Sequence, residues 1–196
     1  MHPDVWQIFD ADGNALAGRG RDSALKNPDR EKGDTDYVGG VAIWFIQKLE
    51  KTPDNPTGIY VLFQQRSQFV DNNKGLWDVS AGGHINLGET NIETAIRETK
   101  EEIGVDIDPS RLIFMTHIPY PDYLMHHYAF VYDWPEHTLD TSMFHFDDKE
   151  VEQVKWVPLS NFEQFIDEYG KNVVKKSTEL RRIVHQTALD HFKEVE

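Results

Sequence analysis

A chain of 196 residues is long enough to bury a substantial core, and we expect a single domain over residues 1–196. The formal net charge of −14 leaves no basic footprint for nucleic acid polymers, and the absence of cysteine excludes disulfides and thiolate metal sites. No apolar run is long enough to cross a bilayer and no signal-peptide pattern is visible, so we expect a cytoplasmic protein without membrane contact.

The first 36 residues predict a β-hairpin and an exposed loop. The apolar runs 5–9 and 15–17 flank an Asp12-Gly13 pair, which is a typical hairpin turn. Residues 20–36 are polar, charged and rich in glycine and aspartate, which favours an exposed loop.

The rest of the chain predicts strands and helices that interleave. Apolar runs predict strands at 40–46, 59–63, 112–118, 124–132 and 151–157, and a short strand at 77–80 that enters a glycine-rich loop. A short helix is expected near 159–168 and a long helix within the C-terminal segment 170–196. The expected fold class is therefore α/β, with a mixed sheet covered by helices.

The C-terminal helix carries apolar residues at helical spacing, among them Leu180, Val184 and Ala188. Such a face usually packs on the body of its own domain. The alternative is a contact between two copies of the chain, which would make the protein a homodimer.

Another amphipathic helix is predicted directly after the glycine-rich loop. Thr90 and Glu93 have the spacing of a capping box, and Gly104 suits a left-handed C-terminal cap. Between them the residues of one expected buried stripe recur at steps of three and four, namely Ile92, Ile96, Thr99 and Ile103.

Three glutamates of this helix, Glu98, Glu101 and Glu102, are expected on an arc well away from that stripe. Like charges at this spacing repel one another, and a divalent cation would relieve the repulsion. The alternative is an acidic helix face in water, which is the usual reason for a run of glutamates.

This part of the chain resembles the Nudix box, in which single glycines, a glutamate, an Arg-Glu pair and a Glu-Glu pair recur at fixed spacing. The matching residues are Gly83, Glu89, Arg97, Glu98, Glu101, Glu102, Gly104 and Val105. Thr99 departs from the pattern, which has a larger aliphatic residue there, and its hydroxyl could bond a carbonyl one turn back. The resemblance implies an α/β/α sandwich that uses Mg²⁺ or Mn²⁺ to hydrolyse a diphosphate linked to another group, X.

The resemblance also implies a set of metal ligands. Glu98 and Glu102 would bind the metal, Glu101 would be a further or bridging ligand, and the carbonyl of Gly83 would complete the shell. Oxygen ligands of this kind are those that hard divalent cations prefer.

Two further residues of the box would support these ligands, because Arg97 would pair with Glu89 and orient Glu98. The general base would be Glu98 or a carboxylate of the acidic stretch 147–152. A solvated turn is the alternative explanation for that stretch.

A narrower resemblance links residues 62–67 and 75–84 to the isopentenyl-diphosphate isomerase branch of the superfamily. That enzyme has a cysteine directly before a Gly-His pair, where this chain has Gly82. His84 matches one of its metal ligands, although a lone histidine in this position is more often a hydrogen-bonding residue of a loop. We therefore expect an isomerase-like Nudix hydrolase without isomerase activity.

Arg66, at the end of a predicted strand, is a candidate for binding a substrate phosphate, because a planar guanidinium suits phosphate oxygens. The alternative is a surface salt bridge. The expected function is the metal-dependent hydrolysis of a small nucleoside-diphosphate-like compound. The alternative is a binding or regulatory module that keeps the fold without turnover.

A run of histidine and tyrosine falls in the predicted strand 124–132. Because successive strand residues face opposite sides, His126 and Tyr128 would share one face and His127 would lie on the other. A shared metal ion is therefore not expected for the two histidines. Aromatic packing is the usual explanation for such a run, although it could also line a pocket.

Overall fold

The computed structural model of the chain describes residues 5–10, 12–16, 18–20, 36–132, 138–146, 149–170 and 177–193. Its main sheet is built around the long strand β4 (Tyr37–Lys48). On one side β4 pairs with the parallel strand β9 (Tyr123–Val131), and β9 pairs with the antiparallel strand β8 (Leu112–Pro119). The predicted strands in these three regions are confirmed.

The other side of β4 is shared by two antiparallel strands. The first half of β4 pairs with β7 (Ala81–His84), and its second half pairs with β5 (Ile59–Arg66). Strand β5 also pairs with β10 (Val151–Pro158) and with the short strand β6 (Trp77–Asp78). The sheet is therefore mixed, as predicted.

Strand β7 corrects one expectation, because residues 81–84 were predicted to form part of a glycine-rich loop. Their glycines carry no alternating apolar pattern that would reveal a strand. The strand forms because the antiparallel register pairs all four residues with residues 40–43 of β4.

The N-terminal segment forms the predicted hairpin turn. The amide of Asp10 donates to the Asn14 carbonyl at 3.0 Å, and Gly13 has the positive φ of 82° that the turn requires. Strand β2 (Ile8–Phe9) pairs with β4, and β1 (Val5–Trp6) pairs with β3 (Arg19–Gly20). The predicted exposed loop lies almost entirely outside the described residues.

Three α-helices complete the described fold, α2 (Asn91–Ile103), α3 (Phe162–Tyr169) and α5 (Thr178–His191). Short 3₁₀ turns precede β8 at Pro109–Arg111 and α3 at Leu159–Asn161. The C-terminal helix is shorter than the segment 170–196 predicted for it. It begins after Ser177, whose side chain accepts a hydrogen bond from the Leu180 amide and so caps the helix.

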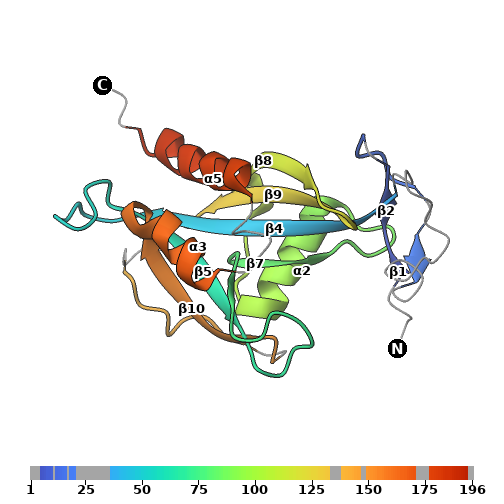
Figure 1. Cartoon of the computed structure of the whole chain (residues 1–196), viewed down its shortest axis with the longest axis horizontal. Helices are drawn as coiled ribbons and strands as arrows, with labels where there is room; N and C mark the ends of the chain where they lie inside the picture. Colours follow the sequence, from blue (N-terminus) through green and yellow to red (C-terminus); the bar gives the residue numbers. More distant parts are fainter. Residues whose placement is uncertain are drawn as a thin grey trace.

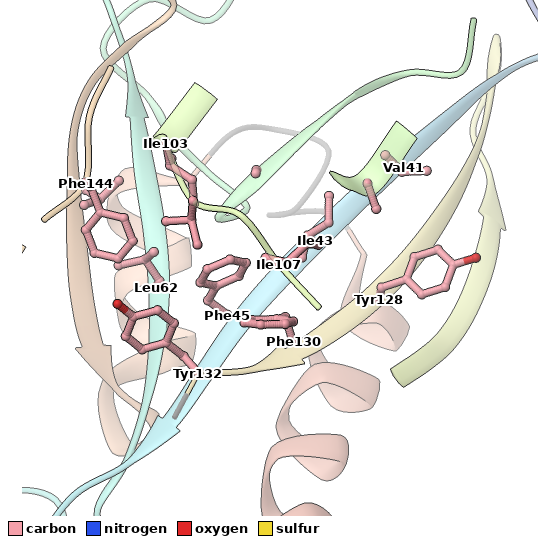
Figure 2. Packing of buried hydrophobic residues seen from close by; sticks show 14 of the residues in the cluster. Val41, Ile43, Phe45, Leu62, Ile103, Ile107, Tyr128, Phe130, Tyr132 and Phe144 are labelled. Carbon is pink, nitrogen blue, oxygen red and sulfur yellow. The ribbon is translucent and has the colours of Figure 1, made fainter. Parts of the chain in front are cut away.

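The helices cover opposite faces of the sheet, and Figure 1 shows α5 and α2 on opposite sides of β4. Helix α2 packs on a cluster that includes Val41, Ile43 and Phe45, and Figure 2 shows Phe45, Phe130 and Tyr132 gathered within it. Helices α3 and α5 pack on the other face. The chain thus forms the predicted α/β/α sandwich.

The apolar face of α5 packs on its own domain, as predicted. Its residues Leu180, Val184 and Ala188 are buried in the same cluster as Trp44 and Phe63 of the sheet. In the part of the chain that the structure describes, no helix is long and apolar enough to span a membrane.

Candidate active site

Helix α2 positions the box residues, and both of its predicted caps are present. The Thr90 hydroxyl accepts from the Glu93 amide at 3.2 Å, and the Glu93 carboxylate accepts from the Thr90 amide at 2.8 Å. Gly104 ends the helix at a φ of 73°. The Thr99 hydroxyl donates to the Ala95 carbonyl at 2.7 Å, so this departure from the box is satisfied within the helix.

The structure separates the three glutamates of α2. Glu98 and Glu102 are buried, with 9% and 3% of their surfaces exposed, whereas Glu101 is exposed. The alternative of an acidic helix face in water is therefore wrong for two of them. The reason is the glycine strand beside the helix, since a Cβ atom at Gly83 would lie only 2.2 Å from the Glu98 Oε1 atom.

Glu102 is held against the edge of β7. Its Oε2 atom accepts hydrogen bonds from the Gly82 amide at 2.7 Å and from the Gln64 side chain at 3.0 Å. Gln64 was not predicted as a site residue. It lies on β5, two residues before Arg66, and strand alternation places both side chains toward α2.

Arg97 connects the carboxylates and the backbone of this region. Its guanidinium contacts Glu89 at 2.9 and 3.0 Å, Glu98 at 2.7 Å and Glu101 at 3.0 Å, and it donates to the His84 carbonyl at 2.9 Å. The predicted pairing with Glu89 and Glu98 is present. Burial opposes the charge of Glu89, but the bonds from Arg97 and its other donors outweigh it and lower its pKa to about 2.

The pKa of Glu98 is shifted in the opposite direction from that of Glu89. Burial raises its pKa to about 7, Arg97 opposes this shift, and the charges of Glu101 and Glu150 add to it. Glu150 belongs to the acidic stretch predicted as a source of the general base, and the structure places it within electrostatic reach of Glu98. Asp147 and Asp148 of that stretch lie outside the described residues.

Among the described residues, no three histidine, aspartate or glutamate side chains converge closely enough to hold a metal ion together. Arg97 bridges Glu98 and Glu101, and Glu102 is turned toward Gly82. The donor set still fits Mg²⁺, which is usually bound through one or two carboxylates and retains several water ligands. All candidate ligands are oxygen atoms, and a cation would favour the charged form of Glu98.

The backbone of β7 offers a carbonyl ligand, but not the one predicted. In an antiparallel strand the amide and carbonyl of one residue point to the same edge, and successive residues alternate. The Gly82 amide points to Glu102, away from β4, so the Gly82 carbonyl faces the carboxylates. The carbonyl of Gly83, which pairs with Val41, points toward β4.

The structure shows the surroundings of three further residues that the sequence singled out. Arg66 is partly buried at the end of β5, and its Nε atom donates to the Asn72 carbonyl at 3.2 Å. His84 stacks on Trp6 with ring centroids 3.9 Å apart. At Gly82, a Cβ atom would lie 2.4 Å from the Val41 carbonyl oxygen, so a cysteine would not fit without a backbone shift.

Comparison with known proteins finds a matching family and related sequences. The NUDIX domain family matches residues 41–176. Nudix hydrolase 3 of Arabidopsis thaliana is 26% identical over 189 residues, which cover 83% of this chain and 23% of that protein. Isopentenyl-diphosphate Delta-isomerase of Cutibacterium acnes is 45% identical over 38 residues, 19% of each chain. The chain therefore matches less than a quarter of the length of either relative.

Solved structures share the fold. The crystal structure of DR0079 from Deinococcus radiodurans has a TM-score of 0.62 at 17% identity and covers 91% of this chain and 97% of that one. The NUDIX domain of Shewanella oneidensis NrtR complexed with ADP ribose has a TM-score of 0.53 at 17% identity, covering 86% and 99%. Because the family match spans more than half of the sequence and the box residues assemble around α2, the chain belongs to the Nudix family.

Proposed function

We propose that this chain hydrolyses the diphosphate linkage of a small nucleoside-diphosphate-like compound in the presence of Mg²⁺ or Mn²⁺. The observation that carries the proposal is the buried pair Glu98 and Glu102, which packs against the glycines of β7, with Glu98 also bonded to Arg97. Burying two carboxylates so close together is costly unless a function requires it. A hydrolytic site that binds a cation would explain that cost.

The residues that would hold the metal are Glu98, Glu102 and the carbonyl of Gly82, with Glu101 as a further ligand. A bound divalent cation supplies polarisation of a phosphoryl oxygen and a lower pKa for a coordinated water. Arg97 fixes the rotamer of Glu98, because its guanidinium also contacts Glu89 and the His84 carbonyl.

The proton of the attacking water would pass to a carboxylate of this chain. Glu98 is one candidate, because it lies at the proposed metal site and Arg97 holds its carboxylate in place. Glu150 is the other candidate, since it directly precedes β10 and its charge acts on Glu98. Comparing Glu98→Gln with Glu150→Gln would separate them through the pH dependence of turnover.

Arg66 is proposed to bind a phosphate group of the substrate, because it extends from β5 on the same face as Gln64. Replacing Arg66 by alanine should raise the Michaelis constant about tenfold, as expected for the loss of a charge-assisted hydrogen bond. Arg182→Ala, on an exposed position of α5, is the matched control. Unchanged kinetics of Arg66→Ala would remove this role.

The proposed function is tested with a mixed panel of diphosphate compounds, including ADP-ribose, dinucleoside polyphosphates and nucleoside di- and triphosphates. Phosphate or nucleotide release is measured with Mg²⁺, with Mn²⁺ and with a chelator. We expect release from at least one compound that stops when the metal is removed. Thermal stabilisation by a compound without any product, at saturating metal, would instead support a binding or regulatory module.

A further inference from the structure

The side chain of Gln64 reaches the candidate active site from outside the box. It belongs to β5 and is only 2% exposed, and its Nε2 atom donates to Oε2 of Glu102 at 3.0 Å. Glutamine is mostly exposed in folded proteins, because a buried amide has to find its partners away from water. Here the acceptor is a carboxylate that is also a proposed metal ligand.

The backbone of Gln64 is fixed by the strands around it. The register places Gln64 opposite Val154 of β10 and opposite Asp78 of β6. Its amide also donates to the Val79 carbonyl at 3.4 Å. Only rotations within the side chain could therefore move the Nε2 atom away from Glu102, and close packing in the interior restricts such rotations.

Glu102 accepts a second hydrogen bond at the same oxygen, from the Gly82 amide at 2.7 Å. The two donors belong to different strands, β5 and β7, and both are uncharged. A single hydrogen bond leaves a carboxylate free to turn about its last side-chain bond, whereas donors from two strands hold it in one orientation.

The two buried carboxylates are held in different ways. Glu98 is bonded to the guanidinium of Arg97, which carries a positive charge. Glu102 accepts from Gln64, which is neutral. A positive side chain beside a ligand repels a bound cation, because the interaction between charges is strong over such short distances. Gln64 can orient its carboxylate without adding this repulsion.

The position of Glu102 also sets its distance from another proposed ligand. The amide and carbonyl of Gly82 point to the same edge of β7, and the carbonyl is the candidate backbone ligand. If the carboxylate of Glu102 swung away, the distance between two ligands of one cation would change. Mg²⁺ demands a near-ideal octahedral geometry, so such a change lowers its affinity.

We propose that Gln64 is a positioning residue, whose amide holds the carboxylate of Glu102 in the orientation that binds the divalent cation. The inference rests on the proposed function and adds a residue outside the box to the support of the metal site. Gln64 is not itself a ligand, so its effect reaches the metal only through Glu102.

Two substitutions remove the contact in different ways. In Gln64→Leu, a side chain of similar size carries no donor. In Gln64→Asn, the amide is kept but withdraws from Glu102, because the side chain is one carbon shorter, and this variant suffices if the leucine variant does not fold. Gln47→Leu is the matched control, because Gln47 is 1% exposed on β4 and donates to the Thr138 carbonyl at 3.1 Å.

Binding of Mn²⁺ is measured without substrate, from the loss of the electron paramagnetic resonance signal of the free ion. We expect both Gln64 variants to bind Mn²⁺ about 10- to 100-fold more weakly than the wild type, as when a metal ligand loses its hydrogen-bond partner. Gln47→Leu should bind Mn²⁺ as the wild type does. Wild-type affinity in both Gln64 variants would overturn the proposal.

A double variant separates positioning from a structural role. Glu102→Gln removes the charged ligand, so Gln64 has no metal ligand left to orient. Adding Gln64→Leu to Glu102→Gln should weaken Mn²⁺ binding by no more than about twofold, because effects that pass through one residue do not add. A further loss as large as in the wild-type background would show that Gln64 acts independently of Glu102, and would overturn the proposal.

The same measurement distinguishes the role of Gln64 from the proposed function. If the wild type binds Mn²⁺ more tightly than the Gln64 variants but cleaves no compound of the diphosphate panel, hydrolysis is overturned and the positioning role stands. If the wild type is an active hydrolase but both variants bind Mn²⁺ equally well, only the positioning role is overturned. A wild-type chain that does not bind Mn²⁺ would overturn both.

Discussion

At the scale of single residues, the geometry of the candidate active site depends on one guanidinium, which donates hydrogen bonds to four acceptor groups. Arg97 is only partly exposed, and its planar fork contacts Glu89 through two nitrogen atoms while it also reaches Glu98. Lysine has the same charge but presents it as a point on a flexible stem. The position of Glu98 therefore depends on the shape of the arginine head group as well as on its charge.

Replacing Arg97 by lysine should lower turnover about 10- to 100-fold, the usual effect of losing a residue that orients a ligand. Because the pair with Glu89 is also weakened, the free energy of unfolding should fall by about 1–3 kcal/mol. Steady-state kinetics and urea unfolding measure the two effects. Arg182→Lys, on the exposed surface of α5, serves as control. Wild-type turnover in Arg97→Lys would show that the fork geometry does not matter.

At the scale of elements, α2 is held by signals that lie within its own sequence. The capping box at Thr90 satisfies two amides that the first turn of a helix leaves without partners. The left-handed conformation of Gly104 ends the helix and lets its amide bond the Lys100 carbonyl. These contacts set the register in which Glu98 and Glu102 meet β7.

Replacing Thr90 by alanine should lower the free energy of unfolding by about 0.5–2 kcal/mol, because the Glu93 amide loses its acceptor. Thr90→Ser keeps the hydroxyl and should retain most of the stability. Urea unfolding of the three proteins measures the difference. If alanine and serine gave the same loss, the cap bond would contribute nothing.

The bounds of α2 could be predicted from the sequence because caps and periodicity are local properties. The burial of Glu98 and Glu102 could not, since it depends on the glycines of β7 lying beside the helix. Strand β7 itself was missed because glycines show no apolar alternation, and β4 supplies the partner. Likewise, no sequence pattern joins Gln64 to Glu102 across 38 residues.

At the scale of the whole molecule, the two faces of the sheet carry different buried polar groups. The α2 face carries the carboxylates, and the α5 face carries the buried imidazole of His127. The mixed sheet covered by helices followed from the interleaved pattern of strands and helices. The register that places His127 opposite Ala42, and Ala42 opposite Gly82, is not defined by the sequence alone.

Buried histidines make the stability of the whole chain depend on pH. Burial lowers the pKa of His126 to about 4 and that of His127 to about 3, whereas unfolded histidine titrates near pH 6.5. Between these values the unfolded chain binds protons that the folded chain does not, so stability falls as the pH falls from about 6.5 toward 3. Urea unfolding should show a smaller loss between pH 7 and pH 4 for His127→Asn than for the wild type. Parallel losses would contradict the burial of a neutral ring.

The most direct test of the central claim is the metal-dependent turnover of Glu102→Gln on the best substrate of the diphosphate panel. Glutamine can keep the hydrogen bond from the Gly82 amide but carries no charge for a cation. We predict that turnover falls about 100-fold or more, while the melting temperature changes by no more than about 5 °C. Wild-type turnover in a folded Glu102→Gln protein would contradict the assignment of this carboxylate to the metal site.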